Sequence, residues 1–338
     1  MSDLIRFQHH QSAHCESGVT SNLLRHAGVQ ISEAMSFGIG SGIFFLHLPW
    51  IKVMDIPLTS YRSFPGTIFK KNCRRLGIAY EYRKFRDPIR GARALDDYLR
   101  AGRAVGIQAN IHWLSYVPEK FRFQFNAHNL VVCARNEDGS YIVSDPVLET
   151  TSICPASAMT RARFAKGMLA PKGLIYFPQL QENHTDKLPL ENAIRSGLRE
   201  TLRRMLFSPV PFAGVRGIRF LAGKMRQWPT KYPDLAMRKL HMANVVRMQE
   251  EIGTGGAGFR FLYAAFLQES GERLGSQVLK DAARNMTEAG NAWRDFATLA
   301  ARFCKGTLEQ PFEEISDRLL TIADQEQAIY QTLRRHYL

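Results

Sequence analysis

This chain of 338 residues has only five cysteines and lacks long apolar runs. No apolar run reaches the roughly 18 residues that a membrane-spanning helix needs, and the first residues do not resemble a signal peptide. The odd number of cysteines and the lack of CxxC spacing argue against a disulfide framework; the set is Cys15, Cys73, Cys133, Cys154 and Cys304. We therefore expect a soluble protein of the cytoplasm, where thiols stay reduced.

Motifs for nucleotides and metals are also lacking. Gly38, Gly40 and Gly42 do not complete a dinucleotide fingerprint, because position 43 is isoleucine and no strand-turn-helix pattern frames them. The glycine-rich segment 253–258 lacks the Lys-Ser/Thr ending of a Walker loop. A histidine-rich stretch near Cys15 has no second pair of histidines elsewhere, so we expect neither a bound metal nor a bound cofactor; it comprises His9, His10 and His14.

Positive charge is concentrated in one part of the chain. The formal net charge is +14, and residues 195–247 hold twelve basic residues against Glu200 and Asp234. Such a block fits nucleic acid, anionic lipid at a membrane surface, or an acidic carrier protein. Nucleic acid is not expected, because no helix-turn-helix, zinc finger or RNA-binding aromatic strand accompanies the charge. A merely solvated basic face is the alternative.

Hydrophobic periodicity predicts an α+β protein with two domains. Residues 1–178 mix helices and strands, residues 179–187 are polar and fit a linker, and residues 188–338 are almost entirely helical. The expected N-terminal helices are 16–27, 65–76 and 92–101, and the expected strands are 104–111, 123–134, 141–144 and 174–177. Later helices are expected at 213–227, 232–251, 259–270, 275–303 and 311–335. The apolar stripe of the last helix fits intramolecular packing and a homodimer alike.

Cys15 lies where a short polar lead meets the helical pattern of residues 16–27. The unpaired N–H groups and the dipole at the start of a helix favour the thiolate, which is the nucleophilic form of cysteine. The alternative is a small buried hydrophobic residue. Cys15 is therefore a candidate nucleophile that needs a base from elsewhere in the chain.

A histidine and an aspartate in the strand-rich region could supply the base and its orienting acid. His128 begins an apolar strand, and Asp145 ends the next strand after a turn at residues 136–139. Strict pairing leaves Asp145 one or two residues out of register with His128, so a bulge or a longer loop must close the gap. The order Cys, His, Asp is that of papain-like cysteine enzymes.

Two segments resemble a known family. Residues 14–17, 23–28 and 32–42 look like the N-terminal domain of butirosin biosynthesis protein H, and residues 253–267 are similar to the helical domain that follows it in that family. The resemblance implies a fold similar to bacteriocin-processing cysteine peptidases. It also implies that the cysteine takes an acyl group from the phosphopantetheine thioester of an acyl carrier protein and transfers it to an amine or a hydroxyl in specialised metabolism.

By this resemblance Cys15 is the nucleophile, His128 the base and Asp145 the orienting acid. The peptidases carry an oxyanion-binding glutamine six residues before the cysteine, whereas this chain has Gln8 and Gln11, seven and four residues before it. The Cys15 backbone N–H and Gln11 are thus the candidate oxyanion donors.

Further candidates come from the glycine-rich segments and the basic block. Substrate binding is expected at Glu33, Gly38, Gly40, Gly42, Gly255, Gly256, Arg260 and Tyr263, although Glu33 fits a helix cap or a buried ion pair as well. The arginines expected to dock the carrier protein are Arg195, Arg199, Arg203, Arg216 and Arg219. A peptidase or amidase with the same three residues, and a non-enzymatic membrane-surface or scaffold protein, remain the alternatives.

Overall fold

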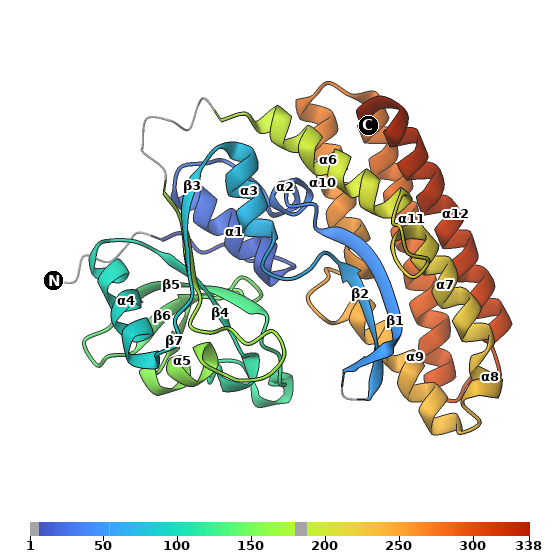
Figure 1. Cartoon of the computed structure of the whole chain (residues 1–338), viewed down its shortest axis with the longest axis horizontal. Coiled ribbons are helices and arrows are strands. Elements are labelled where there is room, and N and C mark those ends of the chain that lie inside the picture. Colours follow the sequence, from blue (N-terminus) through green and yellow to red (C-terminus); the bar gives the residue numbers. More distant parts are fainter. Residues whose placement is uncertain (1–6, 54, 180–187) are drawn as a thin grey trace. The chain divides into compact units, whose positions relative to one another are not determined.

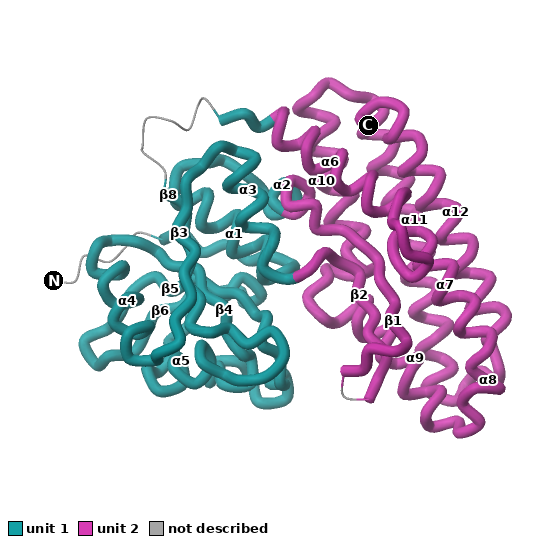
Figure 2. Tube along the Cα trace, viewed as in Figure 1, with its two compact units in different colours: residues 1–36, 65–190 teal, residues 37–64, 191–338 magenta. Residues whose placement is uncertain are grey.

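The computed structural model describes residues 7–53, 55–179 and 188–338. The chain forms two compact units, each of which draws on two parts of the sequence (Figures 1 and 2). Unit 1 comprises residues 1–36 and 65–190, and unit 2 comprises residues 37–64 and 191–338. This division differs from the continuous one expected from the sequence, because residues 37–64 pack with the later helices. The expected linker lies outside the described residues except for Gln179, which ends a strand.

Unit 1 is built on an antiparallel sheet with strand order β3-β8-β4-β5-β6-β7. Its strands are β3 (Ala79–Arg83), β4 (Val105–Ala109), β5 (His128–Arg135), β6 (Tyr141–Ser144), β7 (Ser152–Cys154) and β8 (Ile175–Gln179). Its helices are α1 (Cys15–His26), α3 (Ile68–Leu76), α4 (Pro88–Arg100) and α5 (Ala156–Arg163), with short 3-10 turns at Ile111–Trp113 and Glu119–Phe121. Helix α2 (Glu33–Ile39) crosses from unit 1 into unit 2. The mixed α+β class expected from the sequence is confirmed.

Alternation along the central strands assigns the helices to opposite faces of this sheet. Ile107 and Leu130 belong to the apolar core that also holds Leu95 of α4 and Met159 of α5. Gly106 points to the other face, where the ring of Tyr176 and the side chain of Leu23 on α1 fill the space that a Cβ would occupy. The absence of a side chain at Gly106 therefore lets α1 approach the sheet closely.

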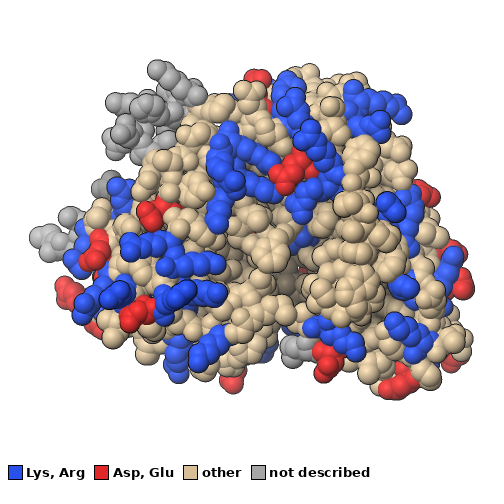
Figure 3. All heavy atoms as spheres, viewed as in Figure 1, with Lys and Arg blue, Asp and Glu red and all other residues tan. Residues whose placement is uncertain are grey.

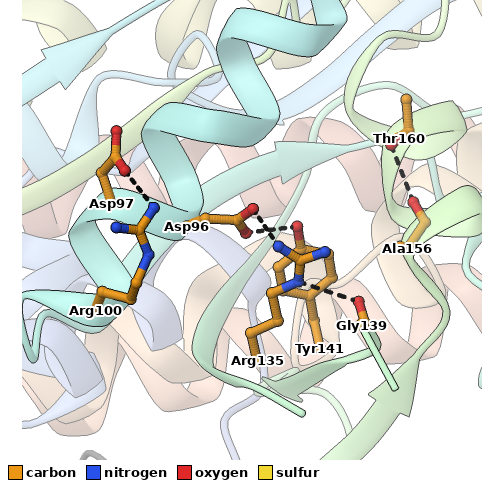
Figure 4. Close-up of polar contacts among 8 residues, drawn as sticks. All are labelled: Asp96, Asp97, Arg100, Arg135, Gly139, Tyr141, Ala156 and Thr160. Carbon is orange, nitrogen blue, oxygen red and sulfur yellow. Dashed lines mark hydrogen bonds and ion pairs between the residues drawn. The ribbon is translucent and has the colours of Figure 1, made fainter. Parts of the chain in front are cut away.

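A polar network holds α4 against the far end of the β5–β6 hairpin. Asp96 of α4 accepts hydrogen bonds from Arg135 at the end of β5 and from the Tyr141 hydroxyl at the start of β6, the latter at 2.8 Å (Figure 4). Arg135 also donates to the carbonyl of Gly139 in the turn, at 3.4 Å. Because His128 and Asp145 lie at the opposite end of this hairpin, the network helps to set their register.

Unit 2 combines a long hairpin with seven α-helices in the part of the chain that the structure describes (Figure 1). The hairpin consists of β1 (Ile43–Val53) and β2 (Ile56–Arg62), which pair antiparallel. The helices are α6 (Leu190–Leu206), α7 (Gly214–Arg226), α8 (Trp228–Lys231), α9 (Leu235–Glu250), α10 (Arg260–Arg273), α11 (Gln277–Cys304) and α12 (Phe312–Tyr337), and a 3-10 turn, Ala257–Phe259, precedes α10. The sequence patterns predicted α10, α11 and α12 to within three residues at each end.

Two sequence expectations need correction. The strand expected at 123–134 begins only at His128. The side chain of Asn126 donates to the carbonyls of Lys166 and Met168 at 3.1 and 2.8 Å, which ties the preceding segment to a loop instead of to the sheet. The β1–β2 hairpin was not expected at all, because its buried residues are covered by helices that come 150 or more residues later.

Candidate active site

Cys15 is the first residue of α1, as the sequence predicted. His14 is the N-cap residue, and its Nδ1 accepts a hydrogen bond from the Ser17 backbone N–H at 3.3 Å. This bond satisfies one of the donors that a helix start leaves unpaired. Cys15 itself is 8 % exposed. The residue is therefore buried, and it lies at the positive end of the helix dipole.

The structure brings His128 and Asp145 together with Cys15. The Nε2 atom of His128 lies 2.7 Å from Oδ2 of Asp145, and both side chains are buried. Since Nε2 donates to the carboxylate, Nδ1 is the ring nitrogen that remains available to Cys15. Burial by itself would lower the pKa of His128. The charge and hydrogen bond of Asp145, together with Cys15, outweigh burial and raise this pKa to about 10.

A bulge, one of the two devices expected, narrows the register gap between His128 and Asp145 by one residue but does not close it. Val131 pairs with Ser144 and Val132 with Val143, but the pairing shifts by one residue before Ala134. Asp145 then leaves the ladder directly after β6, and its carboxylate reaches the histidine at the start of β5.

Asp145 is held by two further donors. The Tyr116 hydroxyl donates to Oδ2 at 2.9 Å, and the Val147 backbone N–H donates to Oδ1 at 3.3 Å. Burial and the neighbouring Asp145 raise the pKa of Tyr116 well above its usual value, so this hydroxyl keeps its proton and remains a donor. Nothing in the sequence pattern pointed to Tyr116, because it lies in an irregular segment 29 residues before its partner.

Asn129 is a second polar residue that sequence reasoning missed. Its Nδ2 atom lies 4.0 Å from Sγ of Cys15 and donates to the carbonyl of Ala127 at 2.9 Å. Its Oδ1 atom accepts a hydrogen bond from the Tyr176 hydroxyl at 2.9 Å. Both side chains are buried, so the amide is held with its donor side toward the thiol. The available signal was an asparagine inside an otherwise apolar strand.

Glu33 caps the helix that carries Cys15. Its carboxylate accepts hydrogen bonds from the backbone N–H groups of Ala13 and His14, at 2.9 and 2.8 Å, and from the Ser17 hydroxyl at 3.0 Å. Burial raises the pKa of Glu33, and these three hydrogen bonds partly oppose that shift. Of the three roles considered for Glu33, which are substrate binding, a helix cap and a buried ion pair, the geometry supports the cap.

The segment before Cys15 lies along the loop that follows Asp145. His9 hydrogen-bonds through Nδ1 to the Ser144 hydroxyl at 2.7 Å and through Nε2 to the carbonyl of Leu148 at 3.0 Å. The Ser12 N–H donates to the carbonyl of Pro146 at 2.6 Å. Gln11, expected as an oxyanion donor, is exposed in this segment. Across residues 7–53, 55–179 and 188–338, no group of three or more His, Cys, Asp or Glu residues could hold a metal ion.

The glycine-rich candidates belong to unit 2, where close packing explains several of them. The rings of Phe266 and Phe37 occupy the positions that a Cβ would take at Gly38 and Gly42. The backbone is left-handed at Gly255 and Gly256, with φ of 64° and 86°, which glycine alone adopts at low cost. Gly40 is buried in the turn after α2. These glycines therefore have structural explanations that do not require a substrate.

Arg260 and Tyr263 are fully buried within unit 2. The Arg260 guanidinium pairs with Glu326 through Nε at 2.8 Å and Nη2 at 3.1 Å, and its Nη1 donates to the carbonyl of Gly258 at 2.7 Å. Trp293 also donates to Glu326, at 2.7 Å. The arginine expected to hold a substrate anion instead neutralises an internal carboxylate.

The arginines expected to dock a carrier protein lie on α6 and α7. Arg199 donates to the carbonyl of Tyr337 at 3.2 Å, Arg195 lies over the ring of that tyrosine, and Arg219 pairs with Asp324 at 2.6 Å. Arg203 and Arg216 are exposed. Figure 3 shows a group of basic side chains over α6 with an acidic one among them. Acidic neighbours therefore reduce the positive surplus of this surface.

Comparisons with known proteins match two families along the chain. Residues 14–146 match the family described as butirosin biosynthesis protein H, N-terminal, and this range contains Cys15, His128 and Asp145. Residues 157–333 match a family described as a domain of unknown function (DUF4872). No match was found among curated proteins. No helix in the described part of the chain is long and apolar enough to cross a membrane.

Proposed function

This chain belongs to the family of butirosin biosynthesis protein H, N-terminal, with the DUF4872 domain behind it, and we propose that it is a cysteine-dependent acyltransferase of specialised metabolism. Cys15 takes an acyl group from the phosphopantetheine thioester of an acyl carrier protein and transfers it to an amine or hydroxyl acceptor. The observation that carries the proposal is the buried His128, which hydrogen-bonds to Asp145 through Nε2 and whose pKa is raised by both Asp145 and Cys15.

A papain-like catalytic domain is part of this proposal. Its support is a cysteine at the start of a helix that packs on an antiparallel sheet, with histidine and aspartate at adjacent strand ends. Because Nε2 donates to the carboxylate, Nδ1 is left for the thiol in this proposal, so the two ring nitrogens have distinct tasks. Asp145 fixes the ring and stabilises the imidazolium.

The first half of the reaction forms an acyl-enzyme. The sulfur of Cys15, paired with the protonated His128, attacks the thioester carbonyl and gives a tetrahedral oxyanion. Collapse breaks the carbon–sulfur bond to phosphopantetheine, and His128 returns its proton to the departing thiolate. The raised pKa of His128, about 10, favours the imidazolium beside the sulfur before attack.

The second half regenerates the Cys15 thiolate paired with protonated His128. An amine or hydroxyl attacks the acyl-Cys15 carbonyl while neutral His128 accepts its proton, and the second tetrahedral intermediate expels the Cys15 sulfur. The product is an amide or an ester. The proton then lies on His128 again, and the enzyme is ready for the next thioester.

Asn129 and the Cys15 backbone N–H are the proposed donors to the developing negative charge. The Asn129 amide lies 4.0 Å from the sulfur and is fixed by the buried Tyr176. Preorganised donors of this kind stabilise charge without reorganising during the reaction. Gln11 stays a third candidate, which would act only after a movement of the exposed segment that carries it.

Docking of an acidic carrier protein on the basic block of unit 2 remains part of the proposal. Arg203 and Arg216 are exposed, whereas Arg195, Arg199 and Arg219 have partners within unit 2. The exposed pair is therefore the first choice for charge reversal. Loss of carrier-dependent acylation, with unchanged acylation by a small thioester, would identify a docking defect.

The test is direct detection of the acyl-enzyme. The protein is incubated with acyl carrier proteins loaded with chains of several lengths, and the intact mass is measured. We expect an acyl adduct on the wild type, none on Cys15→Ala, and a strongly reduced rate on His128→Ala. Absence of any adduct on the wild type across the chain lengths would disprove the proposal.

A peptidase or amidase is the second candidate, because the same three residues can pass the acyl group to water. An acyl adduct alone cannot distinguish the two reactions. Product analysis in the presence of excess amine can: amide formation supports transfer, and free acid alone supports hydrolysis.

A further inference from the structure

Unit 2 exposes large apolar side chains on two neighbouring segments. Trp50, at 58 % exposed, lies near the closed end of the β1–β2 hairpin, and Leu240, at 48 %, lies in the early turns of α9. We call the set the hairpin–α9 surface; it comprises Trp50, Ile51, Val53, Leu235, Met237 and Leu240. A soluble protein usually exposes such residues singly, so a group of them indicates an interaction site.

Contacts within unit 2 show that these segments share one end of it. Lys52 pairs with Pro57 across the hairpin, and the carbonyl of Pro57 accepts a hydrogen bond from Asn244 of α9 at 3.5 Å. The charge of Lys52 acts on His241, which directly follows Leu240. In Figure 1 the closed end of the hairpin lies beside α9.

Basic residues surround the hairpin–α9 surface. Lys52 and Lys231 are exposed, and Lys224, Arg238 and Lys239 are half-buried around the same end. These positive charges also affect a buried histidine of β1. Burial, with added repulsion from His241, Lys231 and Lys224, lowers the pKa of His47 to about 4. Two exposed acids oppose this charge. Asp234 uses its carboxylate to cap α9, accepting from Ala236 at 2.9 Å, and Asp55 lies in the hairpin turn.

We propose that the hairpin–α9 surface binds the headgroup region of an anionic phospholipid bilayer. Exposed Trp, Leu, Ile and Met side chains insert at the boundary between headgroups and acyl chains, and flanking Lys and Arg attract anionic lipid. Tyr232, half-buried between α8 and α9, adds an amphipathic ring at the level where headgroups would lie. Binding would therefore combine attraction between the basic residues and anionic headgroups with shallow insertion of the apolar side chains. It would not require a helix that spans the membrane.

The placement of the apolar residues favours lipid over an acidic protein partner. The apolar residues lie where the β1–β2 hairpin closes and where α9 begins. They therefore project from the ends of two secondary-structure elements and do not line the side of a single helix or sheet. Each insertion would bury one or two side chains, which is the mode of a peripheral membrane protein. This inference does not depend on the proposed acyl transfer.

The experiment is co-sedimentation of the full chain with phosphatidylcholine vesicles, with and without phosphatidylglycerol. We expect binding only to the anionic vesicles and a loss of binding as salt increases. Trp50→Ser should weaken binding by about tenfold, as expected for removal of one inserted aromatic side chain. The double variant Lys52→Gln/Lys231→Gln should weaken it by roughly fivefold for each charge removed.

The matched control is Ile153→Ser, which removes an equally exposed apolar residue, 61 % exposed, from β7 of unit 1. It should bind vesicles as the wild type does. Circular dichroism of each variant verifies folding. The inference is overturned if the wild type fails to bind anionic vesicles at low salt, or if Trp50→Ser binds as tightly as the wild type. It is equally overturned if Trp50→Ser abolishes binding of an acidic carrier protein while no variant changes vesicle binding.

Discussion

The buried charged group around Asp145 in unit 1 and the one around Glu326 in unit 2 differ in whether their hydrogen-bond networks are complete. In unit 2, Arg260, Glu326 and Trp293 satisfy one another with geometry close to ideal, and both carboxylate oxygens are used. In unit 1, Asp145 binds one ring nitrogen of His128 and leaves the other for the thiol of Cys15, which helps to raise the pKa of His128. The comparison teaches that burial of charge alone does not indicate function. A buried group becomes chemically useful where the network ends on an atom that can react.

The largest effect should come from removing His128, the proposed general base, from the unit 1 network. His128→Ala removes the proton acceptor for Cys15, so acylation by a carrier thioester should slow by about 10²–10⁴-fold. Rapid-quench mass spectrometry measures that rate. Arg260→Met serves as the opposite case: it should leave the intrinsic acylation rate per folded molecule close to wild type. Equal rate losses in both variants would contradict the distinction between the two networks.

Breaking the unit 2 network should instead destabilise the fold. Arg260→Met leaves Glu326 buried without its cation and should lower the free energy of unfolding by about 3–5 kcal/mol. Denaturant titration measures this change. The double variant Arg260→Met/Glu326→Met should be less destabilised than the single one, since no unpaired charge remains. A single variant as stable as the wild type would show that the pair is not needed for folding.

Stability as a function of pH sharpens the comparison. The pKa of His128 rises from 6.5 in the unfolded chain to about 10 in the folded protein. Its stabilising contribution is therefore complete below pH 6.5 and is lost as pH rises through 10. Asp145→Asn removes the carboxylate that raises the pKa of His128. The free energy of unfolding of the wild type should therefore exceed that of the variant by the largest amount at pH 6, and the difference should shrink toward pH 10. A difference that stays constant with pH would argue against the buried His128–Asp145 ion pair.

A smaller effect is expected at Asn129. Loss of one weak hydrogen bond to the sulfur should cost about 0.5–1.5 kcal/mol, so Asn129→Ala should slow alkylation of Cys15 by iodoacetamide between twofold and about tenfold. Tyr176→Phe, which removes only the hydroxyl that holds the amide, should have a weaker effect in the same direction. Alkylation is measured on protein in which Cys73, Cys133, Cys154 and Cys304 are shown by peptide mapping to stay unmodified. An unchanged rate in Asn129→Ala would remove this residue from the site.

The smallest effect concerns the helix cap. Glu33→Ala removes the acceptor for three donors at the start of α1 and should lower the free energy of unfolding by about 0.5–2 kcal/mol. Glu33→Gln keeps an acceptor oxygen and should recover part of this loss. If the two variants instead abolish acyl transfer to one acceptor while stability is unchanged, the alternative of a substrate-binding Glu33 would be supported.

Local patterns predicted the parts of the site that depend on neighbours in the sequence. The polar lead and the amphipathic run of residues 16–27 place Cys15 at a helix start, and the hairpin signal after His128 brings Asp145 back toward it. A bulge or a longer loop could be anticipated because strict pairing left Asp145 out of register with His128, and the structure has a bulge that removes one residue of this offset. Helices in the second half follow from their apolar stripes, since the period of 3.6 residues is a property of the chain itself.

Long-range packing decided the rest. Asn129 meets Cys15 across 114 positions and Tyr176 across 47, and Arg260 meets Glu326 across 66. No periodicity records such pairs, because each depends on how helices and strands pack after they form. By itself, the sequence determined the class of fold, the start of α1 and the order in which Cys15, His128 and Asp145 follow one another along the chain. Only the tertiary structure decided that residues 37–64 join the helical unit, that Arg260 neutralises Glu326, and that Asn129 faces the thiol, because burial forces each polar group to find whichever partner the packing brings within reach.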